Sequence, residues 1–252
     1  MIPFIQIFKD IDSLSRSAAD LFLETTTQAI KERGRALIVI SGGSTPLALF
    51  RLLADEPYRS QIDWNALHIF WADERCVPPD DPGSNYGQAR KAFLAQVLIP
   101  EENVHRVNSA LRPVEAAEEY ANTLRDFRDP PLDWPRFDLV LLGMGDDGHT
   151  ASLFPGSDVD VPRPTLAVTA HYQDRPANRV TLTPRVFNTA RKIVFLVSGE
   201  SKVETLARVL AEDNYQPELY PAQRIRPIEG TVIWMIDEAA ASRLPKKFKH
   251  SS

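Results

Sequence analysis

The chain has 252 residues, of which 43% are hydrophobic and 25% are charged, a balance typical of a folded globular protein. Its formal net charge of −5 argues against nucleic acid or an anionic membrane as the main partner, although local cationic and N–H groups could still bind a small anion. Cys76 is the only cysteine, so the chain can form no internal disulfide and no thiolate metal cluster.

Nothing in the sequence resembles a targeting or membrane segment. The first residues, Met1 to Ile7, have no basic flank, and their apolar run is too short for a signal peptide. No segment approaches the roughly 18 consecutive apolar residues of a membrane span. We therefore expect a cytoplasmic protein with no membrane or nucleic-acid partner, acting as a monomer or weak homo-oligomer.

Apolar patterning predicts strands and helices that alternate along the chain. The predicted strands cover residues 3–8, 36–40, 67–71, 139–142, 165–170, 179–182, 193–197 and 231–236. The first predicted helix is capped by Asp12 or Ser13 and stops at Gly34. Later helices are predicted to end near Ala54, to cover 84–97 and 114–127, and to end near Ala211.

This alternation predicts an α/β fold with a mainly parallel, Rossmann-like open sheet flanked by helices. No internal repeat or low-complexity linker divides the chain, so we expect one domain over residues 1–252. Residues 243–252 are basic and are expected to fray.

Four polar loops each follow directly on a predicted strand. They are Ser41–Thr45, Asp73–Arg75, Gly143–His149 and Ser198–Lys202. Ligands of open parallel sheets bind at the carboxyl ends of the strands, so we expect these loops to line one crevice.

The first of these loops is suited to holding an anion. Gly42 and Gly43 let the backbone approach a ligand, and the helix that begins near Ser44 and Thr45 offers N–H groups and hydroxyls. The loop is not a Walker A motif, because no Gly-Lys-Ser/Thr follows. An ordinary strand–turn–helix connection, with Pro46 in the first turn, explains the same residues. The pattern leaves both interpretations open.

The residues 143–148 match the G-x-G-x-x-G fingerprint of dinucleotide-binding proteins, but their context argues against that function. Asp146 and Asp147 would place carboxylates where a pyrophosphate should lie. Pro155 leaves little room for the required helix, and the strand that ends at Ala170 lacks a following acidic residue. We reject the dinucleotide site.

His149 ends this turn and is a candidate general base. A neutral imidazole can take a proton from water at neutral pH, and Asp147 could accept a hydrogen bond from its other ring nitrogen. A structural histidine that stabilises the turn is the alternative. Of the other histidines, His68 is expected to serve packing. The remaining three, His105, His171 and His250, have no supporting neighbours, and no metal site is expected.

Three cations could bind an anionic ligand. Arg75 could contact a carboxylate, a phosphate or an oxyanion, or could pair with Asp73 or Glu74. Arg179 and Lys202 could each face a phosphate or could be solvated surface charges. The residue types alone do not decide.

Several motifs resemble those of the 6-phosphogluconolactonases in the glucosamine-6-phosphate isomerase/deaminase superfamily. In chain order they are Ser41-Gly-Gly-Ser-Thr-Pro46, Phe70-Trp-Ala-Asp-Glu-Arg75, Ser84-Asn-Tyr86, the whole of residues 143–156, and Arg179-Val-Thr-Leu-Thr183. Deaminases of the superfamily read approximately D-G-H-I-A-F-N-E-P-G in the histidine turn. Here Phe154 stands at the position of their acidic residue, which favours the lactonase.

The resemblance implies hydrolysis of 6-phospho-D-glucono-1,5-lactone to 6-phosphogluconate, the second step of the pentose phosphate pathway, without a metal or organic cofactor. It implies that His149 activates water while Asp147 orients its ring, and that Arg75 and backbone N–H groups stabilise the oxyanion. The implied substrate contacts are Gly42, Gly43, Ser44, Thr45, Asp73, Asn85, Gly145, Arg179 and Lys202, with the phosphate on the Gly42–Thr45 turn assisted by Arg179 and Lys202.

Two alternatives stay open. One is an isomerase or deaminase acting on glucosamine 6-phosphate. The other is a non-catalytic sugar-phosphate-binding module, which usually carries an attached DNA-binding segment; here the sequence begins directly with a predicted strand.

Overall fold

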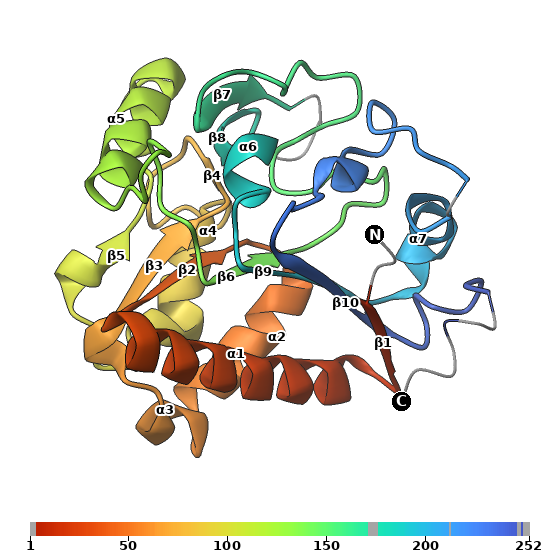
Figure 1. The fold of residues 1–252 in the computed structure, drawn as a ribbon, viewed down its shortest axis with the longest axis horizontal. Helices are drawn as coiled ribbons and strands as arrows, with labels where there is room; N and C mark the ends of the chain where they lie inside the picture. Colours follow the sequence, from red (N-terminus) through yellow and green to blue (C-terminus); the bar gives the residue numbers. More distant parts are fainter. Residues whose placement is uncertain (1–3, 171–175, 212, 246–247, 249–252) are drawn as a thin grey trace.

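The computed structural model describes residues 4–170, 176–211, 213–245 and 248. Within them, seven parallel strands form one sheet in the order β1-β10-β9-β6-β2-β3-β5 (Figure 1). These strands are β1 (Phe4–Phe8), β2 (Ala36–Ile40), β3 (Leu67–Trp71), β5 (Val104–His105), β6 (Leu139–Leu142), β9 (Lys192–Val197) and β10 (Thr231–Asp237). The helices are α1 (Ile11–Arg33), α2 (Ser44–Ala54), α3 (Tyr58–Gln61), α4 (Asn85–Ala89), α5 (Pro113–Asp126), α6 (Pro184–Phe187) and α7 (Val203–Val209). The predicted α/β class with a mainly parallel sheet is confirmed.

The sheet is apolar on both faces, because helices or a second layer cover each side. In β2 all five residues are buried, and alternate side chains point to opposite faces. Ile38 and Ile40 belong to one core cluster with residues of α1 and α2, whereas Leu37 and Val39 belong to the other. This two-sided burial is why the strand reads as an unbroken apolar run.

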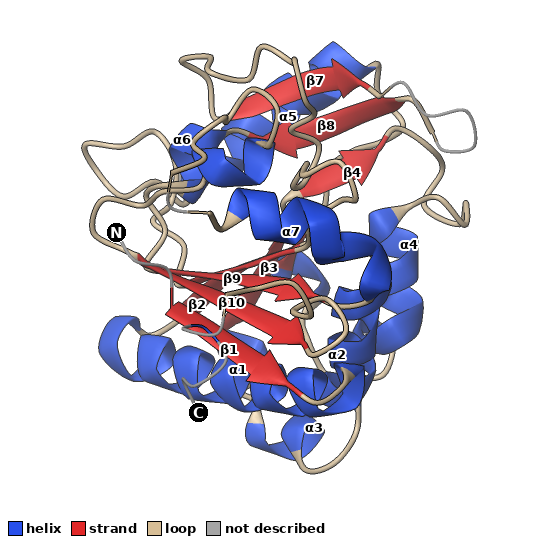
Figure 2. Ribbon diagram, turned by 90° about the vertical axis from the view of Figure 1, so that its right-hand side faces the viewer, coloured by secondary structure: helices blue, strands red, loops and turns tan. Residues whose placement is uncertain are grey.

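A second, antiparallel sheet lies over the first. It has the order β4-β8-β7, with β4 (Asp73–Arg75), β7 (Thr165–Thr169) and β8 (Asn178–Leu182). Figure 2 shows it above the parallel sheet together with α5 and α6, while α1 and α3 lie below. The molecule therefore has helices beneath the parallel sheet and a mixed layer above it.

Residues 73–75 were expected to form a loop, and that expectation is wrong. Ala72 donates to Ile40 O at 2.8 Å, and its own carbonyl accepts from Leu182 N at 2.8 Å. The chain thus passes within one residue from β3 into the ladder of the second sheet. Local patterning cannot show this, because the partner strand lies more than a hundred residues away in sequence.

Two helix predictions also need correction. The N-cap of α1 is Asp10, and Ser13 completes a capping box with it as the third helical residue, so the helix starts earlier than expected. The predicted helix 84–97 is shorter: α4 is followed by a π-helical turn at Arg90–Leu94, and Ala95 N donates to Arg90 O at its end.

The described part of the basic tail is docked rather than frayed. Leu244 and Phe248 are buried in the core, and Arg243 pairs with Glu204 of α7. Two apolar side chains anchor this segment to the core. The basic composition of the tail gave no indication of this packing. Two of the histidines considered above, His171 and His250, lie outside the described residues.

β2 and β6 are parallel neighbours in the sheet, and the order in which the chain adds further strands runs in opposite directions from them. From β2 the chain proceeds outward through β3 to β5, whereas from β6 it proceeds in the opposite direction through β9 to β10. Such a switch point opens a crevice at the carboxyl ends of the two strands. Among the described residues, no helix is long and apolar enough to cross a membrane.

Candidate active site

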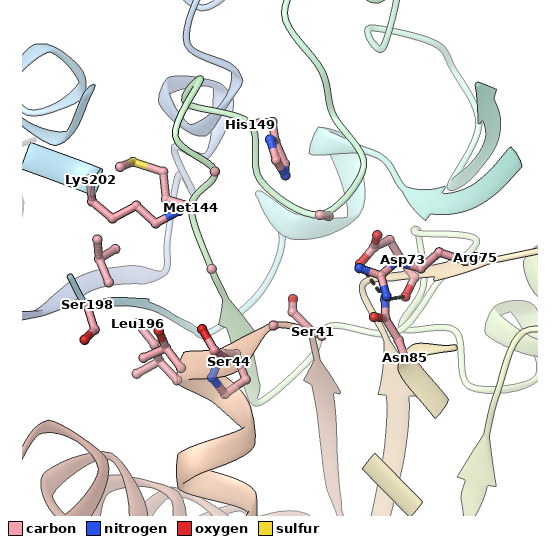
Figure 3. Close-up of a pocket in the computed structure, with 18 of the residues that line it drawn as sticks. Ser41, Ser44, Asp73, Arg75, Asn85, Met144, His149, Leu196, Ser198 and Lys202 are labelled. Carbon is pink, nitrogen blue, oxygen red and sulfur yellow. Dashed lines mark hydrogen bonds between the residues drawn. The ribbon is translucent and has the colours of Figure 1, made fainter. Parts of the chain in front are cut away.

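A pocket lies where the fold predicts it, over the carboxyl ends of β9, β6, β2 and β3 (Figure 3). It brings together all four predicted loops. The predicted site residues that line it are Gly42, Gly43, Ser44, Thr45, Asp73, Arg75, Asn85, Gly145, His149, Arg179 and Lys202. Asp147 does not line the pocket but contacts His149. The residues are assembled as expected, whereas their chemical roles stay predictions.

The turn after β6 presents His149 to this pocket. Gly145 N donates to His149 O at 2.8 Å, and Gly148, with φ of 84°, closes the turn. A Cβ added at Gly145 would lie 2.1 Å from His149 Nδ1, so only glycine lets the imidazole lie this close to the backbone. No helix occupies residues 149–164, all of which are described, and this excludes the dinucleotide-binding geometry.

His149 is paired with Asp147. Its Nδ1 lies 2.5 Å from Asp147 Oδ1, and its backbone N–H donates to the same oxygen at 3.1 Å. A carboxylate on Nδ1 holds that nitrogen as a donor and leaves Nε2 as the basic position. Figure 3 shows the ring pointing toward the pocket. The pair has the geometry of an oriented general base.

The adjacent Asp146 does something else. Asp146 accepts from Lys202 Nζ at 2.5 Å and from Ser201 Oγ at 3.1 Å. Burial is the largest single influence on Asp146 and acts to raise its pKa. The hydrogen bond and the charge of Lys202, together with the bond from Ser201, outweigh burial and hold the pKa below its ordinary value. Asp146 therefore holds Lys202 at the pocket, whereas Asp147 contacts His149.

The N-terminus of α2 forms the floor of the pocket. Its cap is Gly43, with φ of 115°, and no side chain caps the first-turn N–H groups. By contrast, α1 satisfies its first-turn donors with a capping box. A helix end with uncapped donors facing a pocket suits an anion, which favours the anion-cradle interpretation of Gly42–Thr45 over a plain connection.

Arg75 and Arg179 face each other across the β4–β8 ladder. Like charges directly opposite in a ladder are destabilising, so this pair needs a compensating anion. Asp73 Oδ2 lies 3.9 Å from Arg179 Nη1, and Arg75 Nη1 donates to Gly83 O at 2.7 Å. Arg179 is only 3% exposed, so it is not a solvated surface charge. Arg75 forms no ion pair with Asp73 or Glu74, all three of which are described.

Two buried carboxylates behind the pocket were missed by the sequence analysis. Glu74 accepts the backbone N–H groups of Arg75, Asn85 and Tyr86, each at 2.7 Å. Burial raises the pKa of Glu74, although these bonds oppose that shift. Asp237 similarly accepts from Ser198 Oγ at 2.5 Å and from Gly199 N at 3.1 Å. Only the strand-end position of Asp237 and the Asp-Glu-Arg run hinted at these roles.

Eight more residues line the pocket. Four of them, Ser41, Gly143, Met144 and Ser198, belong to the predicted loops but were not singled out as site residues, whereas Pro46, Ala151, Leu196 and Val197 were missed. Most are apolar or small, and their sequence signal is only adjacency to a strand end.

His105 does have a partner, contrary to expectation. Its Nε2 lies 3.1 Å from His68 Nδ1, and its ring stacks on Phe70 with centroids 4.4 Å apart. This pair lies near Phe127, outside the pocket lining, and serves packing, as expected for His68. In the described part of the chain, no group of three or more His, Cys, Asp or Glu side chains could hold a metal ion.

Comparison with known families places this site in context. The profile of the glucosamine-6-phosphate isomerases/6-phosphogluconolactonase family matches residues 9–234. The chain belongs to this family.

The family description names two activities, and similar proteins with assigned names carry one of them. A 6-phosphogluconolactonase of Synechocystis sp. is 39% identical over 246 residues, covering 97% of this chain and 99% of the relative. One from Haemophilus influenzae is 38% identical over 207 residues, covering 82% of this chain and 87% of the relative. These two similar proteins carry the lactonase name.

Solved structures show the same fold. The 6-phosphogluconolactonase of Trypanosoma brucei superposes with a TM-score of 0.84 at 29% identity, covering 96% of this chain and 99% of that one. A monomeric glucosamine-6-phosphate deaminase also superposes, with a TM-score of 0.81 at 23% identity. The fold alone therefore does not distinguish a lactonase from a deaminase. The residues of the site have to make that distinction.

Proposed function

We propose that the protein hydrolyses 6-phospho-D-glucono-1,5-lactone to 6-phosphogluconate in the pentose phosphate pathway. The observation that carries this proposal is the His149–Asp147 pair at the pocket, beside which Phe154 supplies an aromatic ring instead of a carboxylate. Hydrolysis of a lactone needs one base, one water and stabilisation of an oxyanion. The names of the relatives support the same activity.

In the proposed reaction His149 takes a proton from water through Nε2 while Asp147 stabilises the resulting imidazolium. The hydroxide attacks the lactone carbonyl, and the carbonyl oxygen becomes an oxyanion. Collapse of this intermediate breaks the ring ester bond, and the departing ring oxygen takes the proton back from His149. The product is the open-chain acid, which releases its remaining carboxyl proton to solvent and leaves as the carboxylate.

The proposed substrate lies across the pocket. Its phosphate rests on the Gly42–Thr45 turn, and Ser44 and Lys202 appear on the same side of Figure 3. Arg75 appears on the opposite side, and the β4–β8 ladder puts Arg179 with it. We therefore propose that Lys202 serves the phosphate, and that Arg75 and Arg179 stabilise charge at the lactone end. This differs from the expectation that Arg179 assists the phosphate.

The test is a continuous assay of lactone hydrolysis with freshly generated substrate, corrected for spontaneous ring opening. We expect wild-type protein to exceed the spontaneous rate, and His149→Ala to lose about 10²–10⁴-fold in rate. Inorganic phosphate should inhibit both by binding the Gly42–Thr45 turn. Near-normal turnover by folded His149→Ala protein would contradict the role of this histidine.

A parallel incubation with glucosamine 6-phosphate, followed by measurement of ammonia, tests the deaminase alternative. Ammonia release at enzymatic rates would overturn the lactonase proposal. Tight sugar-phosphate binding without turnover of either substrate would instead indicate a non-catalytic module.

Three further expectations stay predictions: one domain, a cytoplasmic location, and a monomer or weak homo-oligomer without a nucleic-acid partner. Limited proteolysis, cell fractionation, and size-exclusion chromatography with light scattering, run with and without added nucleic acid, test them.

A further inference from the structure

The orientation of one pocket side chain, Asn85, is fixed by its donors. Asn85 begins α4 and is only 2% exposed. Its Nδ2 donates to Asp73 O at 2.8 Å and to Asp73 Oδ1 at 3.2 Å. An amide nitrogen has two N–H groups, so these two bonds use both. The reversed amide would set Oδ1 against two acceptors, so the orientation follows from the chemistry of Asp73.

The other end of the same amide accepts nothing from the protein. Asn85 Oδ1 is buried and has no hydrogen-bond partner among the described residues. A buried acceptor without a partner costs about 1–3 kcal/mol, so such an atom in a ligand pocket points to a donor on the ligand.

Two neighbours hold Asn85 in this position. Glu74, itself 2% exposed, accepts the backbone N–H of Asn85 at 2.7 Å and also binds Ser84 Oγ at 3.2 Å. At Gly42, an added Cβ would lie 1.8 Å from Asn85 Oδ1. The amide of Asn85 therefore packs directly against the Gly42–Thr45 turn, in space that any side chain at position 42 would fill.

We infer that Asn85 Oδ1 is a hydroxyl acceptor that selects polyol ligands, and that Glu74 is its positioning residue. This inference rests on the proposed sugar-phosphate substrate and deepens it. A phosphate dianion and a tetrahedral oxyanion both need donors, which Asn85 cannot supply because Asp73 occupies its N–H groups. The donors of a gluconolactone are its ring hydroxyls, so one of them binds Asn85.

This assignment makes Asn85 a specificity residue instead of a phosphate ligand. A site built to pair with a substrate hydroxyl rejects an analogue that lacks it, because the buried partner is then left without a hydrogen bond. We therefore expect Asn85 to distinguish sugar phosphates from simpler phosphate esters. The Gly42–Thr45 turn alone would bind the phosphate of both.

Binding by calorimetry tests the inference without turnover, with 6-phosphogluconate and inorganic phosphate as probes. We expect Asn85→Leu to weaken the affinity for 6-phosphogluconate about tenfold. This factor corresponds to about 1.4 kcal/mol, the value of one buried hydrogen bond. Affinity for inorganic phosphate should stay unchanged. Equal loss of affinity for both probes, or no loss for either, would overturn the inference.

Deoxy analogues of 6-phosphogluconate, each lacking one hydroxyl, identify the partner. For the analogue without the paired hydroxyl, wild type and Asn85→Leu should bind equally. A tenfold difference that persists for every analogue would contradict a hydroxyl contact.

Glu74→Gln tests the positioning role, because a glutamine oxygen can accept from only part of the donor set that Glu74 binds. We expect selective weakening of 6-phosphogluconate, with phosphate affinity retained. If the role of Glu74 were purely structural, Glu74→Gln would lower the melting temperature and leave the ratio of the two affinities unchanged.

Asn103→Leu is the matched control. Asn103 is also buried, and its Nδ2 donates to Asn65 O at 2.9 Å, but it does not line the pocket. Its replacement should lower stability without changing either affinity. If wild type binds 6-phosphogluconate but does not hydrolyse the lactone, the proposed function fails and the Asn85 inference is still decided by the affinities.

Discussion

The ring of Phe154 lies 5.1 Å from the ring of His149, centroid to centroid. The Cζ atom of Arg179 lies 5.4 Å from the same Phe154 ring. One aromatic side chain thus contacts both the proposed base and a buried cation. The resemblance implies an acid at this position in deaminases of the superfamily, so we predict that the apolar ring separates the two chemistries within a shared fold.

The first prediction concerns this ring. Phe154→Leu keeps an apolar side chain but removes the π face that Arg179 contacts, a contact of about 0.5–2 kcal/mol. We expect kcat to fall about two- to thirtyfold with a small change in melting temperature. Phe187→Leu, at a buried phenylalanine outside the pocket, is the control and should leave kcat unchanged. Unchanged turnover in Phe154→Leu would show that the ring only fills space.

The two adjacent aspartates provide a second prediction. Asp147→Asn removes a charged acceptor from His149, a bond of about 1.5–3 kcal/mol, so kcat should fall about 10- to 100-fold at nearly constant KM. Asp146→Asn should instead change KM, because Asp146 holds Lys202. Steady-state kinetics separate the two. The same kinetic effect from both substitutions would contradict the division of roles.

The cations lead to a third prediction. Lys202→Met should raise KM about tenfold with little change in kcat, because the phosphate is remote from the reacting carbonyl. Arg75→Met should lower kcat instead, since an oxyanion contact strengthens in the transition state. Inhibition by inorganic phosphate checks the assignment: it should weaken in Lys202→Met only. Weakened inhibition in Arg75→Met would move the phosphate to the other side of the pocket.

Much of the site was predictable from sequence because parallel strands align their carboxyl ends. The turn at Gly42–Thr45 and the turn that ends at His149 each follow a buried strand, and the sheet order then makes them neighbours. The Asp147–His149 contact was also predictable, since the two residues are close in sequence.

What could not be predicted depends on contacts distant in sequence. The β4–β8 ladder pairs Arg75 with Arg179, and Ser152 Oγ binds Asp73 Oδ2 at 2.6 Å across 79 positions. Neither contact has a periodic signal. Glu74 was a possible ion-pair partner for Arg75, yet it is buried and accepts backbone N–H groups of residues 85 and 86. Tertiary structure decided that Asp73, and not its neighbour Glu74, lines the pocket.

A fourth prediction uses two glycines of the histidine turn. Gly145→Ala would place a Cβ 2.1 Å from His149 Nδ1 and 2.7 Å from Asp147 Oδ1, so the pair must move. We expect kcat to fall by at least tenfold, because a small displacement of a catalytic group is costly. Gly143→Ala is the companion variant, as its added Cβ meets nothing within 4 Å. Equal turnover in the two variants would show that the turn tolerates the displacement.

The last prediction concerns stability in acid. Burial lowers the pKa of His105 from 6.5 to about 4, and the neighbouring His68 adds to this shift. The unfolded chain, with an ordinary histidine pKa, binds more protons than the folded protein between about pH 6.5 and pH 4. The stability contributed by neutral His105 is therefore complete above that range and is lost as the pH falls through it. His105→Gln cannot titrate, so its melting temperature should fall less steeply than that of wild type between pH 7.5 and pH 4.5. Parallel curves for the two proteins would assign the acid sensitivity to other groups.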